Sequence, residues 1–300
     1  MTACAWLPFA VDDLPDGLDY IIGDKTGPVP DDLGRIDFYV MPYRIMRDSV
    51  DVLGQMPRLK VVQLLSAGYE HIIDDVPATA TLCNGRGIHS ASTAELAITL
   101  ILSSLRDIPG FVRAQDEHDW RQGFRPALAD KRVLILGHGS IGEALEQRLL
   151  PFEVEVVRVA RTPRPGFHTT TDLPALLPEV DVVVIAAPLT PETHGMVDAH
   201  FLARMRDGAL LVNIARGAIV DTDALLAQLV SGRLRAALDV TDPEPLPPKH
   251  PLWDAPNTLI TPHVAGPSSA FWPRAKKLVR EQLERYAAGD PLVNVVREGA

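Results

Sequence analysis

The stretch Val133-Leu-Ile-Leu136-Gly137-His-Gly139-Ser-Ile-Gly142 joins four apolar residues to three glycines in the spacing G-x-G-x-x-G. The apolar run predicts a buried strand, and residues 141–150 continue as a predicted helix. Glycines in a strand-to-helix turn allow a tight bend and a close approach of the backbone to a pyrophosphate at the helix N-terminus. The stretch therefore predicts a dinucleotide-binding unit. The residues expected to bind the cofactor are Gly137, Gly139, Ser140, Ile141 and Gly142. We interpret His138, inside the loop, as a variable position rather than a catalyst.

The end of the next predicted strand, residues 154–159, indicates which dinucleotide is bound. NAD-binding units usually place an Asp or Glu about 20 residues beyond the glycine loop, where it bonds the ribose 2′-hydroxyl. This chain has Arg161, Thr162 and Arg164 in that region and no acid. Arginine can pair with a 2′-phosphate through charge-assisted hydrogen bonds, and a threonine hydroxyl adds a donor. We therefore expect NADP(H) as the cofactor, with NAD(H) as the alternative if the two arginines only face solvent.

Apolar runs on both sides of this unit predict an α/β protein. Nearly continuous apolar runs are typical of parallel strands buried on both faces. Strands are expected near residues 20–22, 36–41, 61–65 and 82–83 before the glycine loop, and near 181–187, 209–214 and 235–239 after it. Long helices are expected at about 92–119 and 268–288. We predict that a coenzyme domain of residues 98–283 is inserted in a substrate domain of residues 1–97 and 284–300.

Three later segments place ionisable side chains directly after apolar runs. Arg216 stands before a glycine, Glu244 in a proline-rich loop, and His263 in the turn Thr261-Pro-His-Val-Ala-Gly266. An arginine can hold a carboxylate, and a histidine can move a proton. A carboxylate beside the histidine favours the protonated imidazole. This combination is what hydride transfer to a 2-oxo acid requires.

Five motifs in this order resemble the D-isomer-specific 2-hydroxyacid dehydrogenases. They are the Gly137 loop and residues 187–193, 213–217, 239–247 and 261–266. The resemblance covers essentially the whole chain. It implies a Rossmann coenzyme domain inserted in a flavodoxin-like substrate domain, and a homodimer formed through the coenzyme domains.

The resemblance also implies a role for individual residues. His263 matches the acid/base, Glu244 its carboxylate partner, and Arg216 the arginine that binds the substrate. Asp239 matches a residue that contacts the nicotinamide amide, and the remaining cofactor contacts are expected at Pro188 and Thr193. Backbone N–H groups of Ser66, Ala67 and Gly68 are expected to bind the substrate carboxylate. No metal site is expected. The roles of Tyr43, Arg44 and Trp272 stay open.

The expected substrate is a small 2-oxo acid, and glyoxylate or hydroxypyruvate is favoured because NADP-linked members of the family often reduce them. Three alternatives remain. A dinucleotide-sensing regulator or corepressor could use the same fold. A phosphoglycerate dehydrogenase is less favoured, because the chain ends before the regulatory domain that many of those enzymes carry. A phosphite dehydrogenase is also less favoured, since Ala67 stands where such relatives have a lysine. Formate dehydrogenases, which resemble the family, carry Gln at the position of Glu244.

Bulk properties limit the remaining possibilities. The formal net charge of −10 argues against a nucleic-acid partner, which needs a basic face. The longest apolar stretch, residues 94–105, contains Glu95 and is too short to span a bilayer. Residues 1–6 lack the cationic start of a signal peptide. Cys4 and Cys83 are far apart and are expected to be buried thiols in a reducing compartment. We therefore expect a cytoplasmic protein without a membrane partner.

Overall fold

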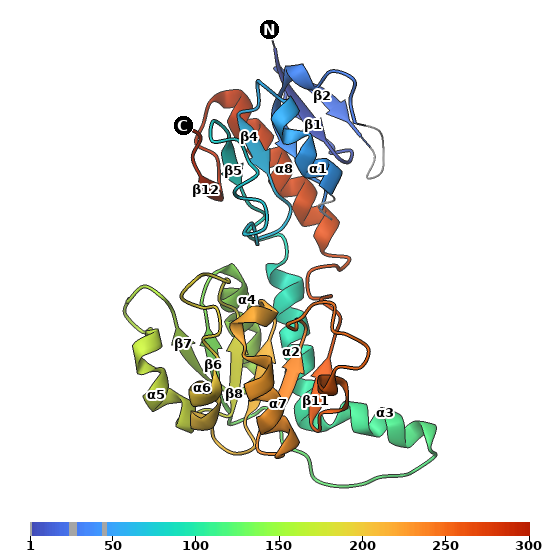
Figure 1. Cartoon of the computed structure of the whole chain (residues 1–300), viewed down its shortest axis with the longest axis vertical. Helices are drawn as coiled ribbons and strands as arrows, with labels where there is room; N and C mark the ends of the chain where they lie inside the picture. The colour runs from blue at the N-terminus through green and yellow to red at the C-terminus, as the bar shows by residue number, and fades with distance from the viewer. Residues whose placement is uncertain (1, 24–28, 44–46) are drawn as a thin grey trace. The chain divides into compact units, whose positions relative to one another are not determined.

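The computed structural model describes residues 2–23, 29–43 and 47–300. The chain divides into two compact units (Figure 1). Unit 1 contains Met1–His89 and Ser269–Ala300, and unit 2 contains Ser90–Ser268. Each unit holds one six-stranded sheet. The expected fold class, two α/β units of which one is inserted in the other, is confirmed.

Unit 2 has a fully parallel sheet with the Rossmann arrangement. Its strands are β6 (Arg132–Leu136), β7 (Glu155–Val159), β8 (Val182–Ile185), β9 (Leu210–Asn213), β10 (Arg235–Leu238) and β11 (Thr258–Ile260). The order across the sheet is β11-β10-β9-β8-β6-β7. A parallel bridge between Val159 and His168 adds a rudimentary strand beyond β7. With this segment the order becomes that of the Rossmann fold, in which the strand order reverses between β6 and β8.

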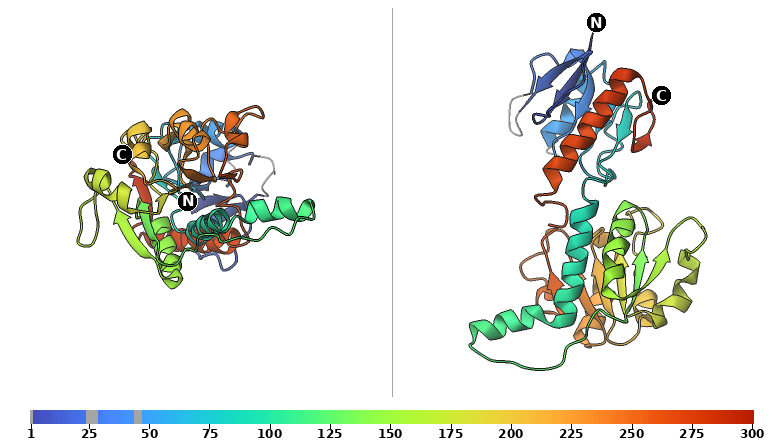
Figure 2. Two further views of the ribbon diagram at one scale, coloured as in Figure 1. Left: turned by 90° about the horizontal axis from the view of Figure 1, so that it is seen from below. Right: turned by 180° about the vertical axis from the view of Figure 1, so that it is seen from behind.

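Both faces of this sheet are buried, as the continuous apolar runs predict. Alternate side chains of one strand enter different cores: Leu134 and Leu136 join one cluster, and Val133 and Ile135 join the other. Helices cover the two faces (Figures 1 and 2). They are α2 (Ser90–Arg106), α4 (Ser140–Leu149), α5 (Leu173–Leu176), α6 (Ala199–Arg204) and α7 (Thr222–Val230). Short 3-10 helices lie at η3 (Leu150–Phe152), η4 (Thr170–Asp172), η5 (Leu177–Glu179), η6 (Gly217–Ile219) and η7 (Pro251–Asp254).

The single helix expected at residues 92–119 is wrong, because the structure has two helices there. The first, α2, begins at Ser90, and the second, α3, spans Ile108–Asp116. Asp107 between them is in the left-handed region with φ of 58°. Pro109 follows in the first turn of α3, and because proline has no backbone N–H it cannot donate the hydrogen bond that a continuous helix would need there. Arg125 fixes the break by donating to Asp107 Oδ2 at 3.1 Å.

Unit 1 has the strand order of a flavodoxin-like sheet. Its strands are β1 (Ala3–Leu7), β2 (Leu18–Ile22), β3 (Ile36–Val40), β4 (Val61–Gln63), β5 (Thr81–Cys83) and β12 (Val295–Arg297). The order is β12-β5-β4-β3-β1-β2, and only β12 pairs antiparallel to its neighbour. The parallel strands alone give the order 2-1-3-4-5, which is that of flavodoxin. The helices of this unit are α1 (Arg47–Asp51), α8 (Phe271–Ala288), η1 (Leu33–Arg35) and η2 (Leu53–Gln55).

Helix α8 places the second boundary between the units after Ser268, whereas the sequence suggests residue 283. Phe271, Leu278 and Leu283 on α8 pack into the core formed with β1, β3 and β4. A buried polar contact strengthens this attachment, since Gln282 Nε2 donates to Gln63 Oε1 at 2.6 Å. The first boundary likewise lies after His89 rather than after residue 97, because α2 packs against the sheet of unit 2.

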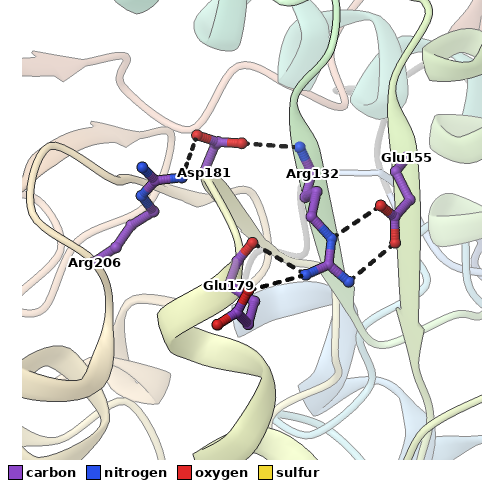
Figure 3. A network of polar contacts seen from close by, with 5 residues as sticks. All are labelled: Arg132, Glu155, Glu179, Asp181 and Arg206. Carbon is purple, nitrogen blue, oxygen red and sulfur yellow. Dashed lines mark hydrogen bonds and ion pairs between the residues drawn. The ribbon is translucent and has the colours of Figure 1, made fainter.

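An ion-pair network joins the amino ends of β6, β7 and β8 (Figure 3). Arg132 makes a bidentate contact with Glu155, with both N–O distances at 3.0 Å. Asp181 accepts from the Arg132 backbone N–H at 3.0 Å and from Arg206 at 3.0 Å. The network therefore links the amino ends of three neighbouring strands.

The described residues also bear on the expectations about cysteines, membrane spans and metal sites. Cys4 and Cys83 are both buried free thiols, as expected, and burial raises the pKa of Cys83 to about 11. Across the described ranges, no helix has the length and apolar character needed to cross a membrane. In the same ranges, no group of three or more His, Cys, Asp or Glu side chains is placed to hold a metal ion.

Candidate active site

All predicted site residues of unit 2 follow the carboxyl ends of its parallel strands. The glycine loop follows β6, Arg161 follows β7, and Pro188 follows β8. Arg216 follows β9, and Asp239 follows β10. His263 comes after β11. In open α/β sheets the carboxyl edge beside the reversal of strand order is where ligands bind. The topology therefore gathers the candidate residues on one edge.

The glycine loop is shaped to receive a phosphate group. Gly137 has φ of +97°, and a Cβ on it would overlap the backbone of Ala187. Gly139 precedes the first residue of α4, and a Cβ there would meet no atom within 4 Å. The loop is therefore closely packed on the sheet side and open at Gly139. Backbone N–H groups of Ser140 and Ile141, in the first turn of α4, are suited to bind an anion. These residues fit a dinucleotide pyrophosphate.

Basic side chains stand at the end of β7, where the sequence predicts the 2′-phosphate. Arg161, Thr162 and Arg164 are all exposed. The Arg164 guanidinium lies 3.7 Å from the ring centroid of Phe167 and donates to the His138 carbonyl at 3.1 Å. Arg164 is therefore held over the glycine loop, and the region fits a phosphorylated ribose.

The loop after β8 closes on itself through a threonine hydroxyl. Thr193 Oγ1 donates to the Pro188 carbonyl at 2.7 Å and accepts from the Thr190 backbone N–H at 2.8 Å. The loop also packs against the glycine loop, through Ala187. Thr193 thus fixes the shape of the segment in which cofactor contacts are expected.

The turn that carries Arg216 is fixed by a buried asparagine. Asn213 is 1% exposed; its amide donates to the Arg216 carbonyl at 2.9 Å and accepts from the Ala215 N–H at 3.0 Å. Gly217 lies so close to Thr241 that a Cβ would overlap the Thr241 carbonyl. The Arg216 turn is therefore packed directly on the segment that leads to Glu244.

The turn that carries His263 is held by the carboxylate of Asp239, which is 1% exposed. Asp239 Oδ1 accepts from Thr261 Oγ1 at 2.6 Å and from the Val264 N–H at 2.9 Å, and Oδ2 accepts from the Ala265 N–H at 3.0 Å. The His263 N–H also donates to the Asp239 carbonyl at 2.8 Å. His263 has φ of 53°, a region that side chains other than glycine seldom occupy. The bonds to Asp239 offset the cost of this conformation.

His263 and Glu244 form the contact that the sequence suggests. His263 Nδ1 lies 2.5 Å from Glu244 Oε1. An ionised carboxylate can only accept, so Nδ1 is the donor and Nε2 is the nitrogen that can exchange a proton with a substrate. The side chains are 45% and 40% exposed, so a small molecule can reach them.

The predicted carboxylate-binding turn lies in unit 1, after β4. Its backbone is fixed by hydrogen bonds to successive carbonyls. Gly85 N–H donates to the Ser66 carbonyl at 2.7 Å, Asn84 Nδ2 to that of Ala67 at 2.8 Å, and Ser66 Oγ to that of Gly68 at 2.8 Å. The preceding Leu65 carbonyl is bonded to the buried His89 ring at 3.1 Å.

The sequence leaves open the roles of Tyr43, Trp272 and Arg44, and the structure describes the first two. Tyr43 and Trp272 pack in the core of unit 1, with ring centroids 4.4 and 4.8 Å from that of Phe271. Arg44 lies outside the described residues.

Sequence reasoning missed the residues that position the site. Asn213 carries a usable signal, because it is a polar residue at the end of an apolar strand. Asp239 ends an apolar strand in the same way, but the turn that it holds cannot be read from that position. The contacts of His138 have no sequence signal.

Comparison with known proteins identifies the family. Residues 98–265 match the NAD binding domain of the D-isomer specific 2-hydroxyacid dehydrogenases. A glyoxylate reductase of Thermofilum pendens is 33% identical over 265 aligned positions, which cover 82% of this chain and 78% of the relative. A mitochondrial formate dehydrogenase of Hordeum vulgare is 36% identical over 308 aligned positions, covering 94% of this chain and 81% of the relative. An NADPH-dependent glyoxylate/hydroxypyruvate reductase of Sinorhizobium meliloti, solved in complex with NADP and sulfate, has a TM-score of 0.82 at 29% identity, covering 98% of this chain and 97% of that one. The chain belongs to the D-isomer specific 2-hydroxyacid dehydrogenase family.

Proposed function

We propose that this protein reduces small 2-oxo acids to 2-hydroxy acids with NADPH. The observation that carries the proposal is the contact between His263 and Glu244, on the same sheet edge as Arg216 and the glycine loop. The exposed Arg161 and Arg164 support NADPH, and so does the NADP-bound relative. NADH remains a possible second cofactor, since the glycine loop binds the part that both share.

The residues have separate tasks in the proposed reaction. NADPH, held by the glycine loop and the basic side chains after β7, would supply the hydride for the carbonyl carbon of the substrate. His263 donates its Nε2 proton to the carbonyl oxygen, and Glu244 stabilises the charged ring from Nδ1. The Arg216 guanidinium pairs with the substrate carboxylate and polarises the carbonyl. Asp239, which holds the turn, would contact the nicotinamide amide when the cofactor is bound.

Glyoxylate and hydroxypyruvate are the proposed substrates. Both appear in the names of relatives, and both are small 2-oxo acids that carry the carboxylate required by Arg216. Backbone N–H groups of Ser66, Ala67 and Gly68 in unit 1 are proposed to bind a substrate carboxylate. The barley relative is named a formate dehydrogenase. Formate dehydrogenases carry Gln at the position of Glu244, so the glutamate of this chain argues against formate oxidation.

We also propose that the protein acts as a cytoplasmic homodimer. Helix α3 and the segment after it extend away from the sheet of unit 2 (Figure 1). Val112, Trp120 and Phe124 on this arm are 53%, 88% and 105% exposed. Large apolar side chains at that exposure favour an interface, and a second copy of unit 2 is the proposed partner. The two buried free thiols suit the cytoplasm.

Steady-state assays test the proposed function. NADPH and NADH oxidation are measured with glyoxylate, hydroxypyruvate, pyruvate and a phosphorylated 2-oxo acid. We expect turnover with NADPH on glyoxylate and on hydroxypyruvate. Binding of NADPH without turnover on any acid would instead favour the regulator. Reduction of NADP+ or NAD+ with formate or phosphite, measured in parallel, would favour those dehydrogenases.

Charge reversal of Arg161 is expected to change the cofactor preference. A charge-assisted contact with the 2′-phosphate contributes roughly 1.5–3 kcal/mol, or about 10- to 150-fold in affinity. The wild-type kcat/KM should therefore be about tenfold or more higher for NADPH than for NADH. Arg161→Asp should remove or invert that ratio, whereas Arg204→Asp, the same change on exposed α6, should leave it unchanged. A wild-type preference for NADH would contradict the assignment.

Glu244→Gln is expected to lower kcat for reduction. The amide oxygen of Gln can still accept from His263 Nδ1, but it no longer offers a negative charge to the protonated ring. Steady-state measurement of kcat with glyoxylate at saturating NADPH tests this. The same change at Asp242, Asp242→Asn, should leave kcat unchanged; a loss there alone would transfer the role to Asp242.

A further inference from the structure

A polar cluster joins the glycine loop to the segment after β7. Its centre is His138, whose Nε2 lies 2.6 Å from Glu146 Oε2 and whose Nδ1 lies 3.4 Å from Arg164 Nη2. Glu146 is on α4, 9% exposed, and also accepts from Arg158 Nε at 2.8 Å. Phe167 closes the cluster, with its ring centroid 5.0 Å from that of His138. None of these contacts is needed for the proton and hydride transfers described above.

The bonding pattern specifies one form of His138. An ionised carboxylate only accepts and a guanidinium only donates. The neutral ring with its proton on Nε2 donates to Glu146 and accepts from Arg164, so it satisfies both neighbours. Hydrogen bonds from Arg158, and less from His138, hold the pKa of Glu146 below its ordinary value despite its burial. The donor of each hydrogen bond is therefore fixed: Arg164 donates to His138, and His138 donates to Glu146. The bonds link an exposed cation to a buried anion.

The consequence is a fixed position for the Arg164 guanidinium. Phe167 supports one face of it at 3.7 Å, and the His138 carbonyl accepts from Nη2 at 3.1 Å. A flexible arginine loses conformational entropy when it binds an anion, and a pre-positioned one loses less. Arg164 stands at the strand end where Rossmann folds bind the adenosine ribose.

We propose that His138 is a specificity-determining positioning residue, which holds Arg164 over the glycine loop to receive the 2′-phosphate of NADP(H). This rests on the proposed function only for the identity of the cofactor. His138 acts through Arg164, so its contribution applies to NADPH and not to NADH, which lacks the 2′-phosphate.

Dissociation constants of NADPH and NADH, measured by titration calorimetry without substrate, test the proposal. His138→Phe keeps the ring packed on Phe167 but removes both hydrogen bonds. We expect it to weaken NADPH binding about fivefold to tenfold and to change NADH binding by less than about twofold. His138→Gln, which can still donate to Glu146 and accept from Arg164, should recover most of the NADPH affinity. His168→Phe, in the same segment but at a side chain 50% exposed, is the matched control and should leave both constants unchanged.

A double-mutant cycle separates positioning from a direct contact. Arg164→Ala should weaken NADPH binding about tenfold or more in the wild type, and clearly less when His138 is already Phe. Additive effects would overturn the proposal, as would an equal loss of NADPH and NADH affinity in His138→Phe. A wild-type protein that binds both cofactors equally would refute the proposed NADPH dependence itself. Selective wild-type binding that survives His138→Phe would refute only the role of His138.

Discussion

His263→Ala is expected to lower kcat for 2-oxo acid reduction by about 100- to 10,000-fold, which is the usual contribution of a general acid. The loss arises because His263 Nε2 is the proposed proton donor and Glu244 occupies Nδ1. Since the glycine loop and Arg161 lie on other strand ends, NADPH binding should survive the substitution. Rapid-mixing or steady-state measurement of kcat, with calorimetry of NADPH binding, tests both statements.

The control for this variant is His200→Ala, an exposed histidine on α6. It should retain wild-type turnover. Rates within about threefold of wild type for His263→Ala would remove His263 from the mechanism. Loss of NADPH binding in the same variant would instead mean that the Asp239-anchored turn supports the cofactor more than the chemistry.

Arg216→Lys is expected to raise KM for the 2-oxo acid strongly and to lower kcat as well. Lysine keeps the positive charge but loses the planar fork that can hold a carboxylate with two parallel hydrogen bonds. A lost bidentate contact to a charged group costs about 1.5–3 kcal/mol, so kcat/KM should fall about 10- to 150-fold. Steady-state kinetics with glyoxylate at saturating NADPH measures the effect.

Arg206→Lys provides the matched control, because Arg206 pairs with Asp181 at the opposite edge of the same sheet (Figure 3). This variant should keep the kinetic constants of the wild type. If Arg216→Lys also behaves as wild type, Arg216 does not bind the substrate.

The strands of unit 2 and the site residues at their carboxyl ends can be predicted from the sequence, because the signals there are strong and local. Strands such as β8 and β9 are uninterrupted apolar runs, and the glycine loop gives both the strand before it and the helix after it. Strand β1 was not predicted, because Ala3–Leu7 contains small residues and no β-branched one. The assignment of α8 to a core was not predictable either. Its apolar face is visible in the sequence, but the sequence does not tell which sheet that face meets.

The same distinction holds within the site. Arg216, Glu244 and His263 were found because each lies in a motif whose spacing is local. The contacts that position the site lie outside these motifs: Asp239 holds a turn more than twenty residues away, and Glu146 on α4 reaches back to His138 in the loop before that helix. A glutamate on an amphipathic helix usually faces solvent, so its sequence position gives no sign of the buried contact. Positioning residues are therefore visible only once the fold brings the elements together.

The product formed from hydroxypyruvate by the purified protein with NADPH tests the proposed reaction most directly. One glycerate should form for each NADPH oxidised, it should be the D isomer, and His263→Ala should form almost none. Formation of L-glycerate, or no turnover of any 2-oxo acid by a wild-type protein that binds NADPH, would contradict the proposed reaction.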